Sequence, residues 1–308
     1  MDGMINVYKE KGYTSHDVVA KMRGILRMKK IGHTGTLDPQ AEGVLPVCIG
    51  KATKLCDYLT DKTKTYQAVL LLGRETDTQD ITGKILTENH VEESSEFEKA
   101  AYETIMSFAG TYFQIPPMYS ALKINGKKLY ELARAGKEVE RQPRPVEILD
   151  IQVEKIKLPR IWICVSCSKG TYIRTLCHDI GKKLGCGGCM ESLVRIRSGS
   201  FCVEDSLKLG EIEALRDLGK VADCVIPLEM PFWDLPALVM KSEIGDKRIW
   251  NGNPFDGEMA AVREDFQEEP LPFAKARVYD SKGCFIGIYG YDDKKKRYQP
   301  QKLFLGGS

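Results

Sequence analysis

The most informative stretch of the sequence is Ile31-Gly32-His33-Thr34-Gly35-Thr36-Leu37-Asp38-Pro39-Gln40-Ala41-Glu42-Gly43. A carboxylate, Asp38, stands at its centre, and Pro39 restrains the residue before it to extended backbone. The glycines permit turns that other residues resist, and they let a substrate approach the backbone closely. The stretch therefore predicts a loop that presents one carboxylate, although Asp-Pro also starts many ordinary surface turns.

An apolar run follows this loop, Val44-Leu45-Pro46-Val47-Cys48-Ile49-Gly50, and then Lys51-Ala52-Thr53-Lys54, which begins a short helix expected over 51–60. With the segment from His33 to Pro39, and at these spacings, the run closely resembles the catalytic motif of the TruB-type tRNA pseudouridine synthases. In that family the matching aspartate is the essential catalytic residue, so the resemblance assigns catalysis to Asp38. The family usually has Lys-Pro before the first helix, where this chain has Lys9-Glu10. That departure affects a turn more than the chemistry.

Two downstream positions gain a role from the resemblance. Tyr66 begins a strand expected over 64–73. A tyrosine there is most often half-buried packing, but the matching family residue stacks on the target base. The polar, turn-rich segment 73–83 matches a family segment in which the later aspartate pairs with an active-site arginine. Asp80 is therefore the expected partner of that arginine.

Arg174 is singled out by two arguments. A helix is expected after Lys169-Gly170-Thr171, with apolar residues recurring on one face. Arg174 lies in its first turn, where the helix dipole disfavours a cation, so it requires an anionic partner. The string Cys167-Ser168-Lys169-Gly170-Thr171-Tyr172-Ile173-Arg174 also resembles the second family motif, in which the arginine pairs with the catalytic aspartate. Both arguments predict an anionic partner, and the resemblance names Asp38.

Leu193 completes the expected pocket. It lies in a strand expected over 191–201, which resembles a third motif whose leucine lines the base pocket. A plain core position explains this leucine equally well. We also expect Tyr172 and His33, which lie in the second and first motifs, to contact the substrate.

The prolines at 227, 231 and 236 predict a domain boundary near residue 234. The resemblance implies that residues 1–233 form a mixed α/β (α+β) pseudouridine synthase domain with a central antiparallel sheet. A basic insertion at about 120–145 resembles a loop that grips RNA in the bacterial stand-alone synthases. Residues 234–308 resemble, more weakly, a small β-rich PUA-type RNA-binding domain.

Bulk composition excludes several classes of protein. The chain has 308 residues, 43% of them hydrophobic, and a net charge of only +2, so an RNA surface would require local clustering of charge. No apolar run approaches the roughly 20 residues of a membrane span and no signal peptide precedes the first strand, so a cytoplasmic protein is expected. Cys186-Gly187-Gly188-Cys189 has the spacing of half a zinc site. The possible second half, Cys177 with His178, has the wrong form, because adjacent residues would point to different helix faces. No metal is expected.

The resemblance implies a reaction and a substrate. Uracil would be detached from C1′ of its ribose, rotated and rejoined through C5, at uridine 55 in the T loop of tRNA. The base must leave the RNA stack to react. Isomerisation changes neither composition nor redox state, so we expect no cofactor. We expect the tRNA T arm as partner, no membrane, no obligatory protein partner, and a monomer as the simplest state.

Three alternatives remain. A uracil-C5 methyltransferase would need a cysteine nucleophile, but Cys48 lies in an apolar strand and is interpreted as core. A non-catalytic tRNA-folding chaperone would be indicated by changes at Asp38, Tyr66 or Arg174, and all three are intact. An RNA-guided, dyskerin-type synthase would have the insertion at 120–145 reduced, and here it is present.

Overall fold

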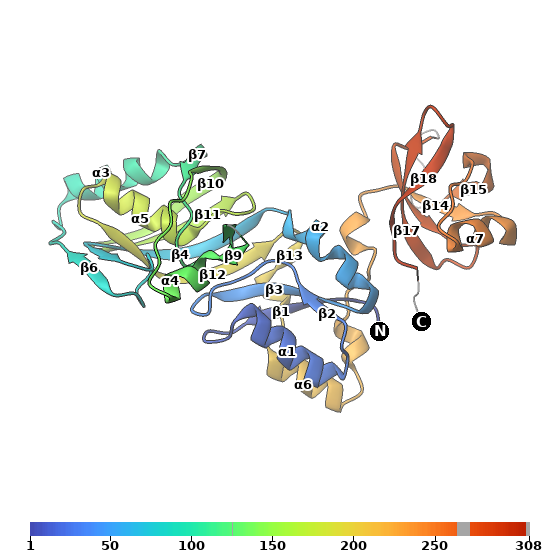
Figure 1. Cartoon of the computed structure of the whole chain (residues 1–308), viewed down its shortest axis with the longest axis horizontal. Helices are drawn as coiled ribbons and strands as arrows, with labels where there is room; N and C mark the ends of the chain where they lie inside the picture. Colours follow the sequence, from blue (N-terminus) through green and yellow to red (C-terminus); the bar gives the residue numbers. More distant parts are fainter. Residues whose placement is uncertain (125, 264–271, 306–308) are drawn as a thin grey trace.

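The computed structural model describes residues 1–124, 126–263 and 272–305. Within these ranges the strands form a nine-stranded sheet, a five-stranded sheet and two short hairpins. Figure 1 shows the large sheet with its helices at one end of an elongated molecule and the small sheet at the other. The predicted mixed α/β architecture with a β-rich C-terminal part is confirmed.

The large sheet carries the predicted site. Its strand order is β1 (Gly3–Lys9), β3 (Glu42–Ile49), β12 (Gly188–Ser198), β4 (Lys64–Leu72), β11 (Arg160–Cys167), β10 (Arg144–Lys157) and β7 (Gly110–Gln114). Strand β2 (Ile31–His33) pairs with β3, and β13 (Phe201–Cys202) pairs with β12. The pairing is antiparallel except between β12 and β3, which run parallel. This exception brings the C-terminal half of β12 beside the start of β3, directly after the Asp38 loop.

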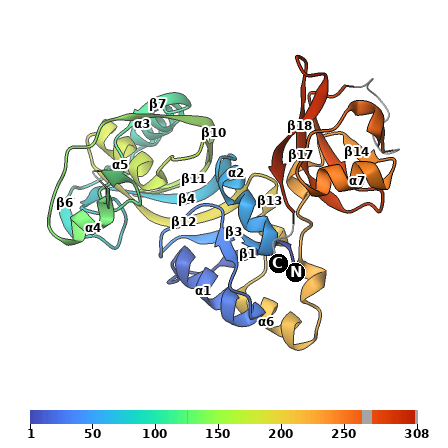
Figure 2. The same cartoon turned by 45° about the vertical axis from the view of Figure 1, so that its right-hand side comes forward.

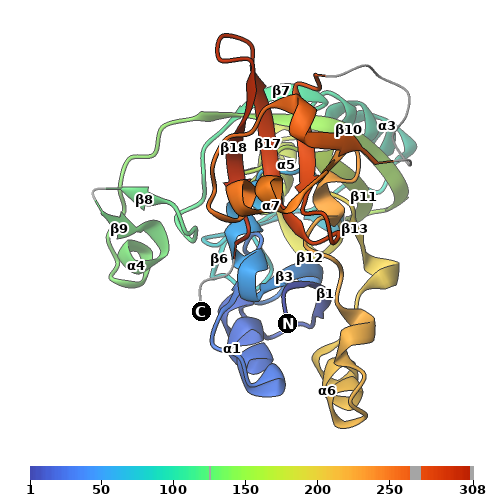
Figure 3. The same ribbon diagram turned by 90° about the vertical axis from the view of Figure 1, so that its right-hand side faces the viewer.

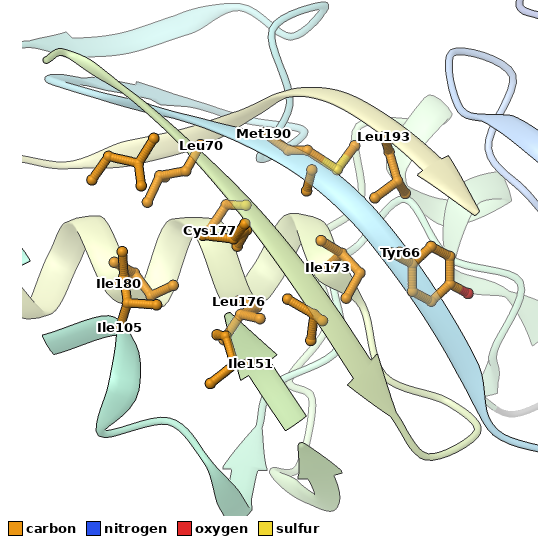
Figure 4. Packing of buried hydrophobic residues seen from close by; sticks show 14 of the residues in the cluster. Tyr66, Leu70, Ile105, Ile151, Ile173, Leu176, Cys177, Ile180, Met190 and Leu193 are labelled. Carbon is orange, nitrogen blue, oxygen red and sulfur yellow. The ribbon is translucent and has the colours of Figure 1, made fainter. Parts of the chain in front are cut away.

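Helices pack against both parts of this sheet. Helices α1 (Ser15–Leu26) and α6 (Leu209–Asp217) share an apolar cluster with β1 and β3. Thr14 caps α1, because its hydroxyl accepts the Asp17 backbone N–H at 3.0 Å. Helices α3 (Ser95–Met106) and α5 (Ile173–Lys183) bury their apolar faces against β4, β10 and β11. Figure 4 shows α5 lying beneath these strands, with Leu176, Cys177 and Ile180 turned toward them.

Two sequence predictions of element boundaries were wrong. The helix expected over 51–60 is a 3-10 turn, Gly50–Leu55, followed by α2 (Cys56–Thr60), and the Thr53 hydroxyl closes the turn by donating to the Gly50 carbonyl at 2.8 Å. The strand expected over 191–201 ends at Ser198 because Gly199, with φ of 59°, and Ser200 form a tight hairpin turn. Both errors come from local turn chemistry at polar residues and glycines.

The insertion between β7 and β10 projects from the body of the molecule. It contains the short strands β8 (Lys123–Ile124) and β9 (Lys127–Lys128) and helix α4 (Leu129–Arg134). Figure 3 shows this unit on two extended connections, to one side of the sheet. Residue 125, within this insertion, lies outside the described residues. A second hairpin, β5 (Arg74–Thr76) and β6 (Ile85–Glu88), carries Asp80 in its loop.

The C-terminal sheet has the order β15 (Ala260–Val262), β14 (Ala237–Met240), β16 (Lys275–Tyr279), β17 (Phe285–Asp292) and β18 (Arg297–Leu303), with α7 (Glu243–Trp250) packed against it. One apolar cluster joins the two parts of the chain. It contains Leu55 and Leu59, in the 3-10 turn and α2 beside the large sheet, together with Phe232, Ile288 and Phe304. Figure 2 shows the small sheet beside α2. The boundary near residue 234 remains a prediction. In the described part of the chain, no helix combines the length and apolarity needed to span a membrane.

Candidate active site

Asp38 lies in the loop between β2 and β3, and a hydrogen bond to the first residue of α1 fixes that loop. The Leu37 backbone N–H donates to the buried Ser15 hydroxyl at 2.9 Å, at the start of α1. The Ala41 N–H donates to the Asp38 carbonyl at 3.1 Å and closes the turn around Pro39. The Asp38 side chain remains 37% exposed. The loop therefore holds one carboxylate where solvent reaches it.

The structure contains the predicted pair between Asp38 and Arg174. Arg174 Nε lies 2.8 Å from Asp38 Oδ2, and Nη2 donates to Oδ1 at 3.2 Å. The Arg174 side chain is only 4% exposed, and its remaining N–H groups donate to the carbonyls of Thr78 at 3.0 Å and Tyr119 at 2.9 Å. Three segments besides α5 thus hold this guanidinium. A buried arginine whose two terminal nitrogens are both hydrogen-bonded fixes the carboxylate that it contacts.

Asp80 supports the arginine from the other side. Its Oδ2 lies 3.7 Å from Arg174 Nη1. Its Oδ1 accepts hydrogen bonds from the Thr78 hydroxyl at 2.9 Å and from the Thr82 backbone N–H and hydroxyl at 2.9 and 2.6 Å. These hydrogen bonds within its own loop fix the orientation of the Asp80 carboxylate toward Arg174. The anionic partner required by a cation in the first turn of α5 is therefore a pair of carboxylates.

Tyr66 and Leu193 lie on neighbouring strands, β4 and β12, next to the Asp38 loop. Both belong to the same buried cluster as Leu37 and Ala41, which flank Asp38 in sequence. Figure 4 shows Tyr66 and Leu193 at the same end of this cluster, with Ile173 nearby. Burial raises the pKa of the Tyr66 hydroxyl, which therefore stays neutral at physiological pH. The two side chains form an apolar wall beside a charged pair.

Tyr172 and His33 are placed differently from each other. Tyr172 precedes α5, and its backbone exchanges two hydrogen bonds with the Gln114 side chain, at 2.8 and 3.0 Å. These hydrogen bonds fix the start of α5, directly before the helical turn that carries Arg174. His33 packs edge-on against His16, with ring centroids 5.5 Å apart, and burial lowers its pKa. In the described ranges, no hydrogen bond or ion pair joins His33 to the other predicted residues.

Sequence reasoning placed Lys9 in a turn and missed its contact with the Asp38 loop. Its side chain is fully buried, and Nζ donates to the carbonyls of Tyr13 at 2.6 Å, Glu10 at 3.2 Å and Pro39 at 3.2 Å. Burial lowers its pKa to about 8, although the nearby Asp38 opposes that shift. Lys9 thus anchors the residue directly after Asp38. The sequence signal was a lysine at the end of a mostly apolar strand.

Arg195 was also missed. It is 1% exposed, and its guanidinium donates to the carbonyls of Val44 at 2.7 Å and Gly35 at 3.3 Å, at the two ends of the Asp38 loop. Gly43 makes this approach feasible, because a Cβ there would lie 2.3 Å from the Arg195 carbonyl oxygen. The sequence signal for Arg195 was its spacing from Leu193. Residues two apart in a strand lie on the same face, so Arg195 is expected on the same face as the predicted pocket residue.

The cysteines do not build a metal centre. Cys177, Cys186 and Cys189 are buried free thiols, and burial raises the pKa of each, to about 11 for Cys189. Among the residues that the structure describes, no group of three or more His, Cys, Asp and Glu side chains is arranged to hold a metal ion. These thiols pack in the core as small apolar groups.

Comparison with known families identifies this arrangement. Residues 23–173 match the family model described as TruB family pseudouridylate synthase (N terminal domain). Residues 174–232 match the model described as tRNA pseudouridylate synthase B C-terminal domain. The chain belongs to the TruB family. The predicted resemblance to these isomerases is confirmed.

Curated relatives of this TruB-family chain match it over nearly its whole length. The tRNA pseudouridine synthase B of Lachnoclostridium phytofermentans is 50% identical over 317 residues, covering 99% of this chain and 100% of the relative. The tRNA pseudouridine synthase B of Staphylococcus aureus (strain Newman) is 48% identical over 310 residues, covering 98% and 99%. The resemblance therefore includes the C-terminal sheet.

Solved structures extend the TruB-family fold to larger assemblies. A chain in the structure of an H/ACA RNP bound to a substrate RNA containing 2′-deoxyuridine has a TM-score of 0.70 at 24% identity, covering 99% of this chain and 85% of that one. A chain in a Cbf5-Nop10-Gar1 complex has a TM-score of 0.69 at 25% identity, with coverage of 98% and 85%. These likenesses concern the fold.

Proposed function

We propose that this chain is a tRNA pseudouridine synthase that isomerises uridine 55 in the T loop. The observation that carries the proposal is the 2.8 Å pair between Asp38, which solvent reaches, and Arg174, which is buried, next to the apolar wall of Tyr66 and Leu193. A carboxylate held in this way would meet a flipped base beside this apolar wall. The full-length similarity to relatives named tRNA pseudouridine synthase B supports the choice of tRNA.

The reaction breaks the bond from N1 to C1′ and makes a bond from C5 to C1′. The C5 hydrogen leaves as a proton, and N1 gains one, so composition and redox state are unchanged. Asp38 acts on the reacting atoms as a fixed negative charge, either as nucleophile or as base. Arg174 positions it with two donors and favours its charged form. Tyr66 and Leu193 keep the detached uracil in place and water out.

A stand-alone enzyme fits the chain better than an RNA-guided one. The insertion with α4 carries Lys127, Lys128 and Arg134 on a projecting unit, suited to contact a phosphate backbone. The C-terminal sheet with α7 would supply a second RNA contact in one polypeptide. We therefore propose a monomer that needs no protein partner and no guide RNA.

The test uses the purified chain and an unmodified tRNA transcript tritiated at C5 of uridine. We expect tritium release without cofactor, guide or partner protein, and pseudouridine at position 55 in the mapped product. Asp38→Asn, which preserves side-chain size, is expected to abolish release while changing the tRNA dissociation constant by less than about threefold. Retained release by Asp38→Asn would remove Asp38 from catalysis. Tight binding without release by the unaltered chain would favour the guided enzyme or the chaperone.

A further inference from the structure

A recess lies between α5 and β7, outside the proposed catalytic site. We call it the α5–β7 pocket, and its volume is about 520 Å³. Small-molecule sites typically occupy about 300–1,000 Å³. Its walls come from α5, from the end of the α3 segment, from β7 and the residues after it, and from the segment that follows α4. Figure 1 shows β7, β10, α3 and α5 gathered at this end of the molecule.

Aromatic rings form one side of the α5–β7 pocket. Phe108 and Tyr112 meet edge to face, with centroids 5.3 Å apart at 90°. Phe113 is 69% exposed on the edge strand β7, although a phenylalanine ring gains by burial. Because Tyr112 and Phe113 are consecutive in the strand, the Phe113 ring faces away from the Phe108–Tyr112 pair, and at the rim of the pocket it offers a flat apolar surface to a planar partner.

Cations line the same pocket, and the Lys183 ammonium lies 5.4 Å from the centroid of the Phe108 ring. Arg141, Lys182 and Lys183 line the pocket, and Asp179 is the one carboxylate among the described residues that line it. The net charge of the whole 308-residue chain is only +2. The pocket is therefore a local concentration of positive charge.

Arg141 is held at the pocket by contacts on both sides. Its Nη1 donates to the Pro116 carbonyl at 3.1 Å. Its Nη2 lies 3.5 Å from the Glu138 carboxylate, which is itself 84% exposed and therefore well solvated. Its Nε is buried and finds no hydrogen-bond partner within the described part of the chain. The guanidinium is thus held at the pocket wall by its Nη1 and Nη2 contacts.

The α5–β7 pocket adjoins the proposed catalytic site. The Thr175 hydroxyl donates to Gln79 Oε1 at 2.7 Å, and both residues line the pocket. Thr175 follows Arg174 in the chain, and Gln79 precedes Asp80, so the pocket wall begins one residue away from the buried ion pair. Arg141, which also lines the pocket, belongs to the insertion at 120–145 that is expected to grip RNA. An occupant of this pocket would therefore contact the elements that position the catalytic carboxylate.

We propose that the α5–β7 pocket binds one unpaired nucleotide of the RNA substrate, outside the nucleotide that reacts. Its base would stack on the exposed Phe113 ring at the pocket rim, and its phosphate would pair with Lys182 and Arg141. Stacking platforms flanked by cations are the general means of holding unpaired nucleotides. The inference rests on the proposed function, because it takes the ligand to be part of the same RNA.

Binding by two pocket variants tests the proposal. All proteins carry Asp38→Asn so that the bound tRNA transcript is not turned over. Phe113→Ala removes an exposed ring, and we expect it to raise the dissociation constant roughly 5- to 150-fold, the effect of one lost base stack. Lys182→Ala is expected to lower the slope of log K against log salt by about 1. The matched controls are Tyr102→Ala, an exposed ring on α3, and Lys220→Ala, an exposed lysine after α6.

The outcomes separate the pocket from the reaction. Weakened binding by Phe113→Ala with unchanged controls supports the pocket, and a parallel titration with the isolated T arm tells whether the nucleotide belongs to that arm. Binding of both pocket variants within about twofold of the parent overturns it, even if uridine 55 is isomerised. Weakened binding without tritium release from the unaltered chain would keep the pocket and reject the proposed reaction. Failure of the parent to bind tRNA would reject both.

A cross-linking experiment tests contact directly. Transcripts with single 4-thiouridine substitutions are irradiated on the Asp38→Asn protein, and the cross-linked peptides are identified by mass spectrometry. We expect one unpaired position to cross-link to the peptide that contains Tyr112 and Phe113. Cross-links that never include this peptide, from any unpaired position, would contradict the proposal.

Discussion

Arg174 shows how a single side chain can be costly locally and useful globally. A cation in the first turn of a helix opposes the helix dipole, and burial removes most of its hydration. The pair of carboxylates and two backbone carbonyls around it offset both costs. Such a site tolerates few substitutions, because removing one partner leaves a buried charge uncompensated.

Replacing Arg174 by lysine tests the need for two-point contact. Lysine keeps the charge but not the planar fork that meets both oxygens of Asp38. We expect kcat for tritium release to fall by about 100-fold or more, with little change in the tRNA dissociation constant, because misplacing a reacting group has effects of this size. Arg216→Lys, on the surface of α6, is the control. A kcat within about threefold of the unaltered chain would show that the fork geometry is unimportant.

Lys9 gives a pH dependence to the anchor of the Asp38 loop. Its pKa is lowered to about 8 in the native protein by burial, against an ordinary value of 10.5. Between these two pKa values the unfolded chain holds a proton that the native chain has lost, so stability rises with pH in that window. The gain in stability is complete above the unfolded pKa and absent below the native one.

We therefore expect Lys9→Met to lose more stability relative to the unaltered chain at about pH 10 than at about pH 8, by roughly 2 kcal/mol. The difference between the two proteins cancels the titration of groups that they share. Urea unfolding at both pH values measures it. A loss that shrinks as the pH rises would mean that native Lys9 keeps its proton, held by the three carbonyls.

Among the helices and strands, the approach of α5 to β12 positions the site. Gly181 of α5 lies so close to the turn before β12 that a Cβ there would be 2.2 Å from the Gly188 backbone nitrogen. This contact sets the distance between α5 and the sheet. It therefore also sets the position of Arg174, which lies in the first turn of α5.

Gly181→Ala is expected to destabilise the protein by about 1–3 kcal/mol, the usual cost of overpacking, and to reduce kcat because α5 must shift. Gly24→Ala is the matched control. It lies in α1, where an added methyl group would have no atom within 4 Å, so it should stabilise by about 0.5–1 kcal/mol. Thermal unfolding of both variants distinguishes them. Equal stabilisation by both would show that α5 and β12 have room to separate.

At the scale of the whole molecule, one apolar cluster joins the two sheets. Phe304, from the C-terminal end of the chain, stacks on Phe285 at 5.5 Å and lies near Phe232 at 6.4 Å, in a cluster that includes Leu55 and Leu59. The Lys54 ammonium also donates to the Leu303 carbonyl at 3.0 Å. The two parts should therefore unfold together.

Phe304→Ala tests this coupling. We expect a loss of about 3–5 kcal/mol, typical of a buried phenylalanine, and the division of one calorimetric transition into two, since the shared cluster joins the sheets. Leu218→Ala, 69% exposed on the surface, should leave a single transition at nearly the same temperature. A single transition in Phe304→Ala, merely shifted, would place the coupling elsewhere.

Local patterns in the sequence encode several parts of this protein: the Asp38 loop through Asp-Pro and its glycines, the requirement of Arg174 for an anion, and, through motif spacing, the family. The meeting of distant groups depends on the folded chain. Arg195 and Lys9 bind carbonyls of the Asp38 loop only because β12 and β1 flank β3, and α5, β7 and the insertion enclose a recess only after the sheet has formed. Local propensity carries no information about such contacts, since they join segments up to 160 residues apart.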